Sequence, residues 1–453
     1  MTLRVKSAYS QAVETLCRAT GGSPTVVCAY HGNVDTVHNL ETDRLAAIIQ
    51  REAPDIITEV KYRSVPQTLE TKPDVLHAIV ACFKSGTGGE WRLNSKQLEE
   101  WLEKEFSGLD SLGGTSAIVA NHLAGIGFQP VLHTPSRGRR LAALIDSNVR
   151  CATRNGLLQF GQVAISSEVD PPHIIVQFFA GAVLRIGRKS ITCPHSNRVI
   201  LGHDNAAALL PIDREFSDWL ARGDIPISAG VWCGFNRLDR RIVKTRFHQM
   251  ESDIRNAMTS NRSAVHHFEA SDAREPEVRQ CMCDTVLRSR ASVGMNEQEI
   301  GTLFEHYGIT SCPGDGWKEY LRSVSVLAGL LDADTVVVHA EQFVIGTSRT
   351  LSIPHLAASL AAGCIVAASR AADGGFVTTN KIRNVLEYFA IRSGRAHQLT
   401  VELTRGVYLA VMLPTIDIGP PRYSIGLGDS FVAGLLAQNV RGKNRQRGSI
   451  SNR

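Results

Sequence analysis

Near the C-terminus, a carboxylate stands in a glycine turn just before an apolar helix. The run Gly426-Leu427-Gly428-Asp429 precedes residues 431–438, whose apolar spacing predicts a helix. The first N–H groups of a helix have no partner within it, so this turn could bind an anion. Asp429 could then accept the proton of an attacking hydroxyl while the N–H groups stabilise a transferring phosphoryl group. A plain helix N-cap is the alternative interpretation of Asp429.

A polar pair and a glycine pair lie closer to the N-terminus. Asn33 and Asp35 follow a predicted strand at residues 25–29, and ligands of α/β sheets collect beyond the carboxyl ends of strands. An amide and a carboxylate together can donate to and accept from neighbouring sugar hydroxyls. An Asx turn is the alternative. Gly113 and Gly114 open a predicted helix, where they either let a ligand approach the backbone closely or make a tight loop.

Two glutamates at the ends of further predicted strands are candidates for organising Mg²⁺. Glu269 closes a strand that begins at residue 265, and Glu299 lies with Asn296 where another strand turns into a helix. Mg²⁺ bound partly through water shields phosphates during phosphoryl transfer. For Glu299, favourable first-turn charge on the helix is the alternative. The chain contains neither a Walker A pattern nor the protein-kinase motifs, so phosphoryl transfer would require another kinase architecture.

Taken in chain order, these residues resemble the motifs of the ADP-dependent glucokinase/phosphofructokinase family, which is part of the ribokinase-like kinases. The matching segments extend from about residue 25 to 440 and are Asn33-Val34-Asp35, Gly113-Gly114, Asn197-Arg198-Val199-Ile200, His267-Phe268-Glu269, residues 294–299, His339-Ala340 and Gly426 to Asp429. Val199 and Ala340 depart from the Phe and Thr usual in the family, and Glu269 is followed by Ala-Ser rather than Leu-Ala-Ser.

The resemblance implies a role for each matched residue. Asp429 would be the catalytic base, and Arg198 would be a lid residue that moves onto the transferring phosphoryl group. Glu269 and Glu299 would organise Mg²⁺ through water. The residues implied in nucleotide binding are His339 beside the adenine, Asn296, Gly426, Leu427 and Gly428. The residues implied in sugar binding are Asn33, Asp35, Gly113 and Gly114, with Glu90 and His173 from the lid. Taken alone, Arg198 could be a surface arginine and His339 a core histidine.

The choice of substrates depends on the same resemblance. ADP is the expected phosphoryl donor, and glucose is the expected acceptor because the segment around Glu90 is similar to glucokinase members. Fructose 6-phosphate is the alternative acceptor, with Arg237 placed to bind its phosphate. An ATP-dependent ribokinase-like kinase and an inactive sugar- or nucleotide-binding module are further alternatives. The chain keeps Asp429 and both glutamates, which favours an enzyme.

Apolar strand-like runs alternate with helical segments, which predicts an α/β fold whose mostly parallel sheet is flanked by helices. Strands are predicted at 25–29, 173–178, 230–235, 265–268, 335–339 and 364–368, and helices at 117–124, 297–306, 320–331 and 431–438. Two segments break this rhythm, because one is charged and the other is rich in strands. The expected organisation is a small lid from 43–110 and 163–200, a large nucleotide-binding domain from 20–42, 111–162 and 201–440, and a basic flexible tail at 441–453.

The composition is that of an ordinary soluble protein: 453 residues, 43% apolar and 21% charged, with a net charge of +5. Positive charge is dense only at Arg441, Lys443, Arg445 and Arg447, so we expect the sugar and ADP as partners and no nucleic acid. The ten cysteines follow no common zinc spacing and indicate a reduced, cytoplasmic protein. No run approaches the roughly 18 apolar residues of a membrane span. We expect a monomer or small oligomer.

Overall fold

A computed structural model of the chain describes residues 5–18, 22–56, 60, 64–170, 172–203, 205–271, 273, 275–311, 316–394, 396–419, 421–423 and 425–450. Within these ranges, the side chains of residues 205, 260, 286–288 and 443–450 lie outside the description.

The large domain is built on a sheet of eleven strands in the described part of the chain. Its seven central strands are mutually parallel, and antiparallel strands close both edges. In spatial order they are β19 (His397–Leu403), β20 (Gly406–Pro414), β17 (Phe343–Ser348), β16 (Thr335–His339), β15 (Ser292–Asn296), β14 (Val265–Glu269), β13 (Ile227–Trp232), β1 (Thr25–Ala29), β6 (Gln129–Leu132), β7 (Arg150–Thr153) and β8 (Gly156–Gln159). This arrangement confirms the predicted mostly parallel α/β sheet.

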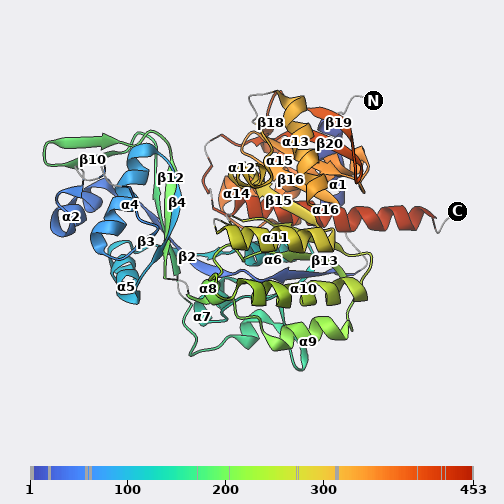
Figure 1. Cartoon of the computed structure of the whole chain (residues 1–453), viewed down its shortest axis with the longest axis horizontal. Coiled ribbons are helices and arrows are strands. Elements are labelled where there is room, and N and C mark those ends of the chain that lie inside the picture. Colours follow the sequence, from blue (N-terminus) through green and yellow to red (C-terminus); the bar gives the residue numbers. More distant parts are fainter. Residues whose placement is uncertain are drawn as a thin grey trace.

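Helices cover both faces of this sheet, so its central strands are buried on both sides (Figure 1). Strand β1 illustrates the alternation: Val26 and Cys28 pack into one apolar cluster, and Val27 and Ala29 into another. The first cluster contains residues of α1 (Val5–Leu16), α6 (Thr115–Gly125), α7 (Arg139–Leu144), α14 (Ile353–Asp373), α15 (Thr379–Tyr388) and α16 (Leu427–Ile450). The second contains residues of α9 (Arg214–Arg222), α10 (Val243–Ser260), α11 (Pro276–Ser289), α12 (Glu297–Tyr307) and α13 (Trp317–Leu330). The short helices α8 (Asn205–Leu209) and η1 (Phe160–Val163) lie in connections.

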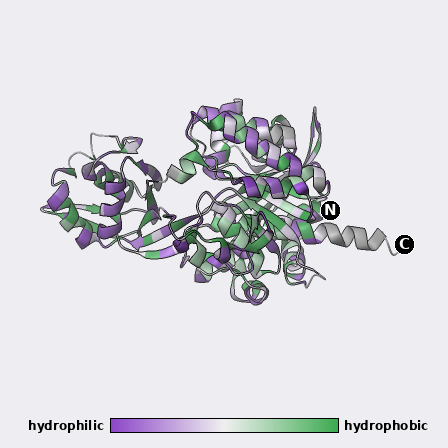
Figure 2. Cartoon of the chain, turned by 90° about the horizontal axis from the view of Figure 1, so that it is seen from below, coloured by the Kyte–Doolittle hydropathy of each residue, from purple (hydrophilic) through white to green (hydrophobic). Residues whose placement is uncertain are grey.

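The smaller domain, which we call the lid, stands beside the large one at the left of Figure 1. Its six described strands follow the order β3 (Thr68–Leu69), β4 (Gly89–Leu93), β12 (Asn197–Gly202), β9 (Pro172–Phe178), β2 (Asn33–Asn39) and β5 (Leu109–Gly113). A separate apolar cluster holds this sheet to α2 (Thr42–Glu52), α4 (Lys72–Ser85) and α5 (Lys96–Glu105). The strands β10 (Val183–Ile186) and β11 (Lys189–Thr192) form a separate hairpin that packs against the same apolar cluster. Figure 2 shows apolar and polar residues interleaved on the elements of both domains.

The lid is discontinuous, as predicted, but its sheet begins earlier in the chain than the proposed boundary at residue 43. Strand β2 pairs with β9 and β5, so residues 33–39 lie in the lid sheet rather than in the large domain. Residues 109–113 and 197–202 also belong to that sheet. The chain therefore enters the lid directly after β1, at Asn33.

Two local predictions are wrong. Residues 364–368 are part of helix α14 and not a strand. This mostly buried helix has apolar residues on every side, so its sequence lacks a clear amphipathic period. Arg441 is not in a solvated tail: helix α16 continues through it, and its guanidinium donates to Thr15 O, Leu16 O and Ile126 O. The rest of the basic run falls on residues whose side chains lie outside the description.

By length and composition alone, helix α14 could cross a membrane. Its most apolar 18-residue stretch has a mean hydropathy of 1.3, but 83% of that stretch is buried inside the protein.

A second short pair of strands, β18 (Ala390–Ile391) and β21 (Ile416–Asp417), lies next to this helix. All nine described cysteines are free.

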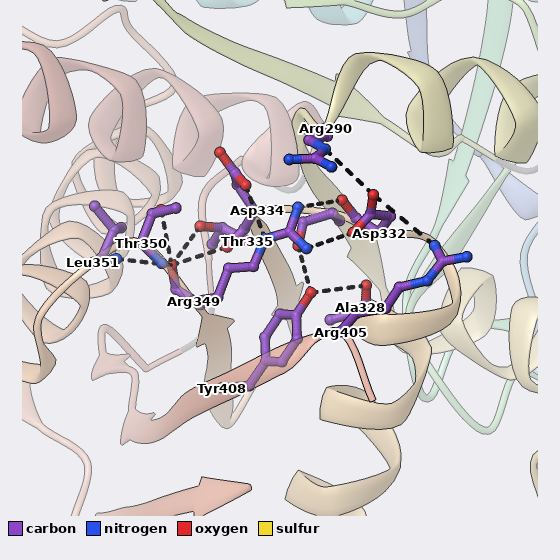
Figure 3. Close-up of polar contacts among 12 residues, drawn as sticks. Arg290, Ala328, Asp332, Asp334, Thr335, Arg349, Thr350, Leu351, Arg405 and Tyr408 are labelled. Atoms are coloured by element: carbon purple, nitrogen blue, oxygen red, sulfur yellow. Dashed lines mark hydrogen bonds and ion pairs between the residues drawn. The ribbon is translucent and has the colours of Figure 1, made fainter. Parts of the chain in front are cut away.

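A polar cluster fastens the antiparallel edge to the parallel core (Figure 3). Arg349, which follows β17, donates to the Asp334 carboxylate at 3.0 Å and to the Asp332 carbonyl at 2.7 Å. The Tyr408 hydroxyl on β20 lies 2.9 Å from Ala333 O. These bonds satisfy carbonyls of the loop between α13 and β16, at the edge of the sheet opposite to the carboxyl ends of its parallel strands.

Candidate active site

The Gly426–Asp429 turn lies where the sequence predicts it, at the start of a long buried helix. Gly426 has φ +68°, a left-handed conformation that glycine adopts without strain, and α16 begins at the next residue. Asp429 is in the first turn, and its carboxylate is hydrogen-bonded to the Thr115 side chain. The turn therefore brings helix N–H groups and a carboxylate to the same place, as phosphoryl transfer requires.

Burial raises the pKa of Asp429 to about 6, and the nearby negative charge of Glu269 adds to the rise. The hydrogen bond from Thr115 and the charges of Arg370 and His339 oppose it. A carboxyl group with this pKa is ionised at neutral pH and is nevertheless a better proton acceptor than an ordinary aspartate.

A cavity of about 660 Å³ opens beside this turn. It contains five of the predicted nucleotide-side and catalytic residues: Arg198, Asn296, His339, Leu427 and Gly428. Small and apolar side chains form much of its remaining wall, namely Val344, Cys364, Ala367, Ala368, Ala371, Ile416, Ile418 and Phe431. Such a wall suits a flat base, while Arg198 and the helix N-terminus suit phosphates. Gly426, Asp429, Glu269 and Glu299 are not among its lining residues.

Arg198 reaches the site from lid strand β12. It lines the cavity, and the charges of Asp35 and Asp429 act on its guanidinium. Burial lowers the pKa of Arg198, and these carboxylates oppose that shift. Its Nε is buried without a hydrogen-bond partner. An arginine from the lid thus lies between the predicted sugar side and the predicted base.

The predicted sugar-binding residues converge on the lid side of the cleft. Asn33 Nδ2 donates to Asp35 Oδ1 at 2.6 Å and lies 3.1 Å from His173 Nδ1. Gly113 must lack a side chain here, because a Cβ would lie 2.3 Å from Asp35 Oδ1. Gly114 occupies the N-cap position of helix α6, next to this group.

Glu90 and Arg237 extend this group across the cleft. Arg237, in the loop after β13 of the large domain, forms an ion pair with Glu90 on lid strand β4. Its Nη1 is 3.2 Å from His173 Nε2. On the sugar side, Glu90 and Arg237 therefore neutralise each other.

Of the two candidate metal residues, Glu269 ends β14 and Glu299 lies in the first turn of α12, and both are engaged within the protein. Glu269 lies 2.9 Å from His267 Nε2 and 3.5 Å from His339 Nε2. Burial alone would raise the pKa of Glu269, but these two histidines lower that pKa to about 2. Glu299 accepts the Asn296 N–H at 2.8 Å, and the Asn296 side chain caps helix α12 in return. Among the described residues, no group of three or more His, Cys, Asp or Glu could hold a metal ion.

These carboxylates fit Mg²⁺ in one respect and not in another. They are oxygen ligands, as Mg²⁺ prefers, and Glu269 carries a full charge at neutral pH. Their oxygens already accept hydrogen bonds, so contact through water suits them better than direct coordination. Glu299 is a first-turn carboxylate of α12, as the alternative interpretation expected, and His339 lies beside the Glu269 carboxylate.

Three residues at the site were missed by the sequence reasoning: Thr115, Arg370 and Tyr423. Thr115 begins helix α6 directly after the glycine pair, and Arg370 is a buried arginine whose charge acts on Asp429. The signal for Arg370 was available, because it is a lone cation in the alanine-rich run 366–372. Nothing in the sequence marks Tyr423.

The fold is that of a two-domain α/β protein whose lid and C-terminal helix border this cleft. Residues 24–438 match the family described as ADP-specific Phosphofructokinase/Glucokinase conserved region. The chain belongs to this family, whose members are sugar kinases and therefore phosphotransferases with an alcohol acceptor.

Relatives with both sugar specificities resemble the chain over nearly its whole length. An ADP-specific phosphofructokinase of Pyrococcus horikoshii is 25% identical, covering 91% of this chain and 96% of the relative. An ADP-dependent glucose/glucosamine kinase of Pyrococcus abyssi is 23% identical, covering 93% and 96%. A solved ADP-dependent kinase in complex with fructose-6-phosphate and ADPbetaS superimposes with a TM-score of 0.79 at 16% identity, covering 97% of this chain and 99% of that one. That structure confirms the fold alone.

Proposed function

We propose that this ADP-dependent sugar kinase phosphorylates glucose. In the reaction, the bond between the β-phosphorus and the bridging oxygen of ADP breaks and AMP leaves. A new bond forms between that phosphorus and a glucose hydroxyl oxygen, and the hydroxyl proton moves to Asp429. The products are AMP and glucose 6-phosphate.

The observation that favours a neutral sugar is the ion pair between Glu90 and Arg237. It neutralises the arginine that lies beside His173, so the charge of this guanidinium is already balanced before a sugar binds. A carboxylate there accepts hydrogen bonds from sugar hydroxyls but repels a sugar phosphate.

We expect Glu90→Ala to lower kcat/KM for glucose by a factor that corresponds to about 1 to 3 kcal/mol, because the sugar hydroxyls lose their acceptor in a closed cleft. The same change frees Arg237, so kcat/KM for fructose 6-phosphate should hold or rise. Steady-state kinetics with both sugars measure the ratio. Glu100→Ala, on the exposed face of lid helix α5, is the matched control and should change neither value. If the ratio of the two values stays unchanged in Glu90→Ala, glucose loses its main support.

Fructose 6-phosphate is the second candidate, and Arg237 is the observation in its favour. A sugar phosphate could displace Glu90 from this guanidinium and form the bidentate contact that arginine makes with phosphates. Six of the relatives that match the chain are named ADP-specific phosphofructokinases. Activity assays with ADP or ATP against glucose or fructose 6-phosphate decide between the candidates.

The residues take the roles expected from the resemblance. Asp429 acts as the base, the N–H groups of the Gly426–Asp429 turn and Arg198 stabilise the transferring phosphoryl group, and His339 lines the base pocket. Asn33 and Asp35, with Gly113, hold the sugar. Mg²⁺, when bound, shields the phosphate charges, and Glu269 and Glu299 would hold it through water.

The raised pKa of Asp429 predicts an acid limb in the pH profile. The base must be ionised, so kcat/KM should fall as the pH decreases through about 6. Thr115→Val removes a hydrogen bond that stabilises the carboxylate, which raises the pKa and moves the limb to higher pH. Thr192→Val, on exposed lid strand β11, should leave the profile unchanged. A limb near the ordinary carboxyl value of 3.8 would contradict this role.

A further inference from the structure

Arg370 is the most deeply buried cation next to the site. Its side chain is 1% exposed on the apolar helix α14, where an unpaired charge is costly. Its Nε donates to Ile425 O at 3.0 Å, and its guanidinium carbon lies 4.8 Å from the Phe376 ring and 4.7 Å from the Tyr423 ring. The guanidinium is thus held between two rings, against the carbonyl that precedes Gly426.

The next carbonyl is held by a second buried chain of hydrogen bonds. The Val377 N–H donates to His122 Nδ1 at 3.1 Å, so the other ring nitrogen carries the proton. His122 Nε2 then donates to Ser430 Oγ at 2.9 Å, and Ser430 donates to Gly426 O at 2.6 Å. Burial and the charge of Arg370 keep the pKa of His122 well below its ordinary value, so it stays neutral. The Ile425 carbonyl therefore accepts a hydrogen bond from Arg370, and the Gly426 carbonyl accepts one from Ser430.

Tyr423 connects this arrangement to the lid. Its hydroxyl lies 2.6 Å from Ser111 Oγ, although the two residues are 312 positions apart. Ser111 is on lid strand β5, where it pairs directly with Asp35 of the predicted sugar site. A single path of contacts thus runs from the Ile425 carbonyl through Arg370 and Tyr423 to the strand beside Asp35.

We propose that Arg370 and Tyr423 are positioning residues: Arg370 holds the Gly426–Asp429 turn in its anion-binding conformation, and Tyr423 ties that turn to lid strand β5. The inference uses the proposed role of this turn but not the identity of the sugar. A planar guanidinium is needed, because it stacks on both rings while its Nε–H reaches the Ile425 carbonyl. The positive charge also lies close enough to act on Asp429 and Asp35, the two carboxylates of the site.

The first test uses Arg370→Lys, which keeps the charge but loses the planar stack and the Nε–H. With whichever sugar the wild type phosphorylates, we expect kcat to fall at least about tenfold, as for the loss of a charge-assisted hydrogen bond, while the Kd of AMP changes less than about threefold. Arg322→Lys, on the exposed face of α13, is the control. A kcat within twofold of the wild type would overturn the role of Arg370.

The second test is a double-mutant cycle of Tyr423→Phe and Ser111→Ala. Tyr423→Phe keeps the ring on Arg370 and removes only the hydroxyl. Each single change should raise the KM of the sugar more than it lowers kcat, and the double variant should be no worse than the poorer single one within about twofold. Additive effects would overturn the link between Tyr423 and the lid, and they would do so even if Arg370→Lys failed to fold.

A third readout does not depend on turnover. Hydrogen exchange of the backbone amides at residues 425–430 should become faster in Arg370→Lys, while that of strand β16 stays as in the wild type. Equal acceleration in both places would mean a general loss of stability and would overturn the positioning role. If the wild type phosphorylates neither sugar with ADP, the proposed function is wrong, and the exchange data alone decide the inference.

Discussion

Asp429→Asn is expected to lower kcat by about 10²- to 10⁴-fold, the range for the loss of a positioned general base. Asparagine has nearly the same shape and keeps an oxygen that can accept the Thr115 hydrogen bond, but it cannot take the proton of the sugar hydroxyl. The N–H groups of the turn remain, so binding of the nucleotide should change little. Steady-state kinetics together with titration of AMP by calorimetry measure both quantities.

Asp218→Asn provides the matched control, because this aspartate lies on the exposed face of α9 with 57% of its side chain accessible. It should retain wild-type kcat. If Asp429→Asn kept at least half of the wild-type kcat, Asp429 would be an ordinary first-turn carboxylate of helix α16 and not the base.

Arg198→Lys is expected to lower kcat by about 10²-fold, the loss seen when one preorganised donor to a developing charge is removed. Lysine is a point charge and cannot reproduce the planar fork of a guanidinium on phosphoryl oxygens. The Nε of Arg198 has no partner in the structure, which fits a donor whose acceptor arrives with the substrate. Because the lid brings Arg198 to the reacting group, the affinity for the nucleotide should fall less than kcat.

Arg185→Lys, on exposed lid strand β10, is the control and should behave as the wild type. Equal losses of nucleotide affinity and of kcat in Arg198→Lys would contradict a role confined to the closed, reacting state. Arg198 would then be an ordinary phosphate anchor.

The sequence alone predicted the parts of the fold whose local pattern is strong. The apolar runs at 25–29 and 335–339 coincide with strands β1 and β16, and the predicted strand-to-helix change near Glu297 lies where β15 meets α12. Asp429 and Asn33 could be proposed as site residues because a glycine turn and a strand end leave a local signature, whereas Arg198 was proposed from the family resemblance. Their motifs, taken in order, also indicated the family.

The sequence failed where burial erased the local pattern or where the partner is distant. Residues 364–368 read as a strand because a helix that is apolar on all sides lacks the period that distinguishes it from one. Strand β2 was assigned to the wrong side of the cleft, because its pairing with β9 joins residues about 140 positions apart and leaves no trace in the local sequence.

Only the tertiary structure decided which side chains act together. Glu269, which was expected beside a metal, is balanced by His339 from another strand of the sheet. Arg441 was expected in solvent, but its guanidinium donates hydrogen bonds to carbonyls of two other segments of the chain. In each case the sequence determined the chemistry of a residue and its place in an element. Its partners were determined by packing between segments that are far apart in the chain, because hydrogen bonds and ion pairs depend on distances in space that sequence spacing does not encode.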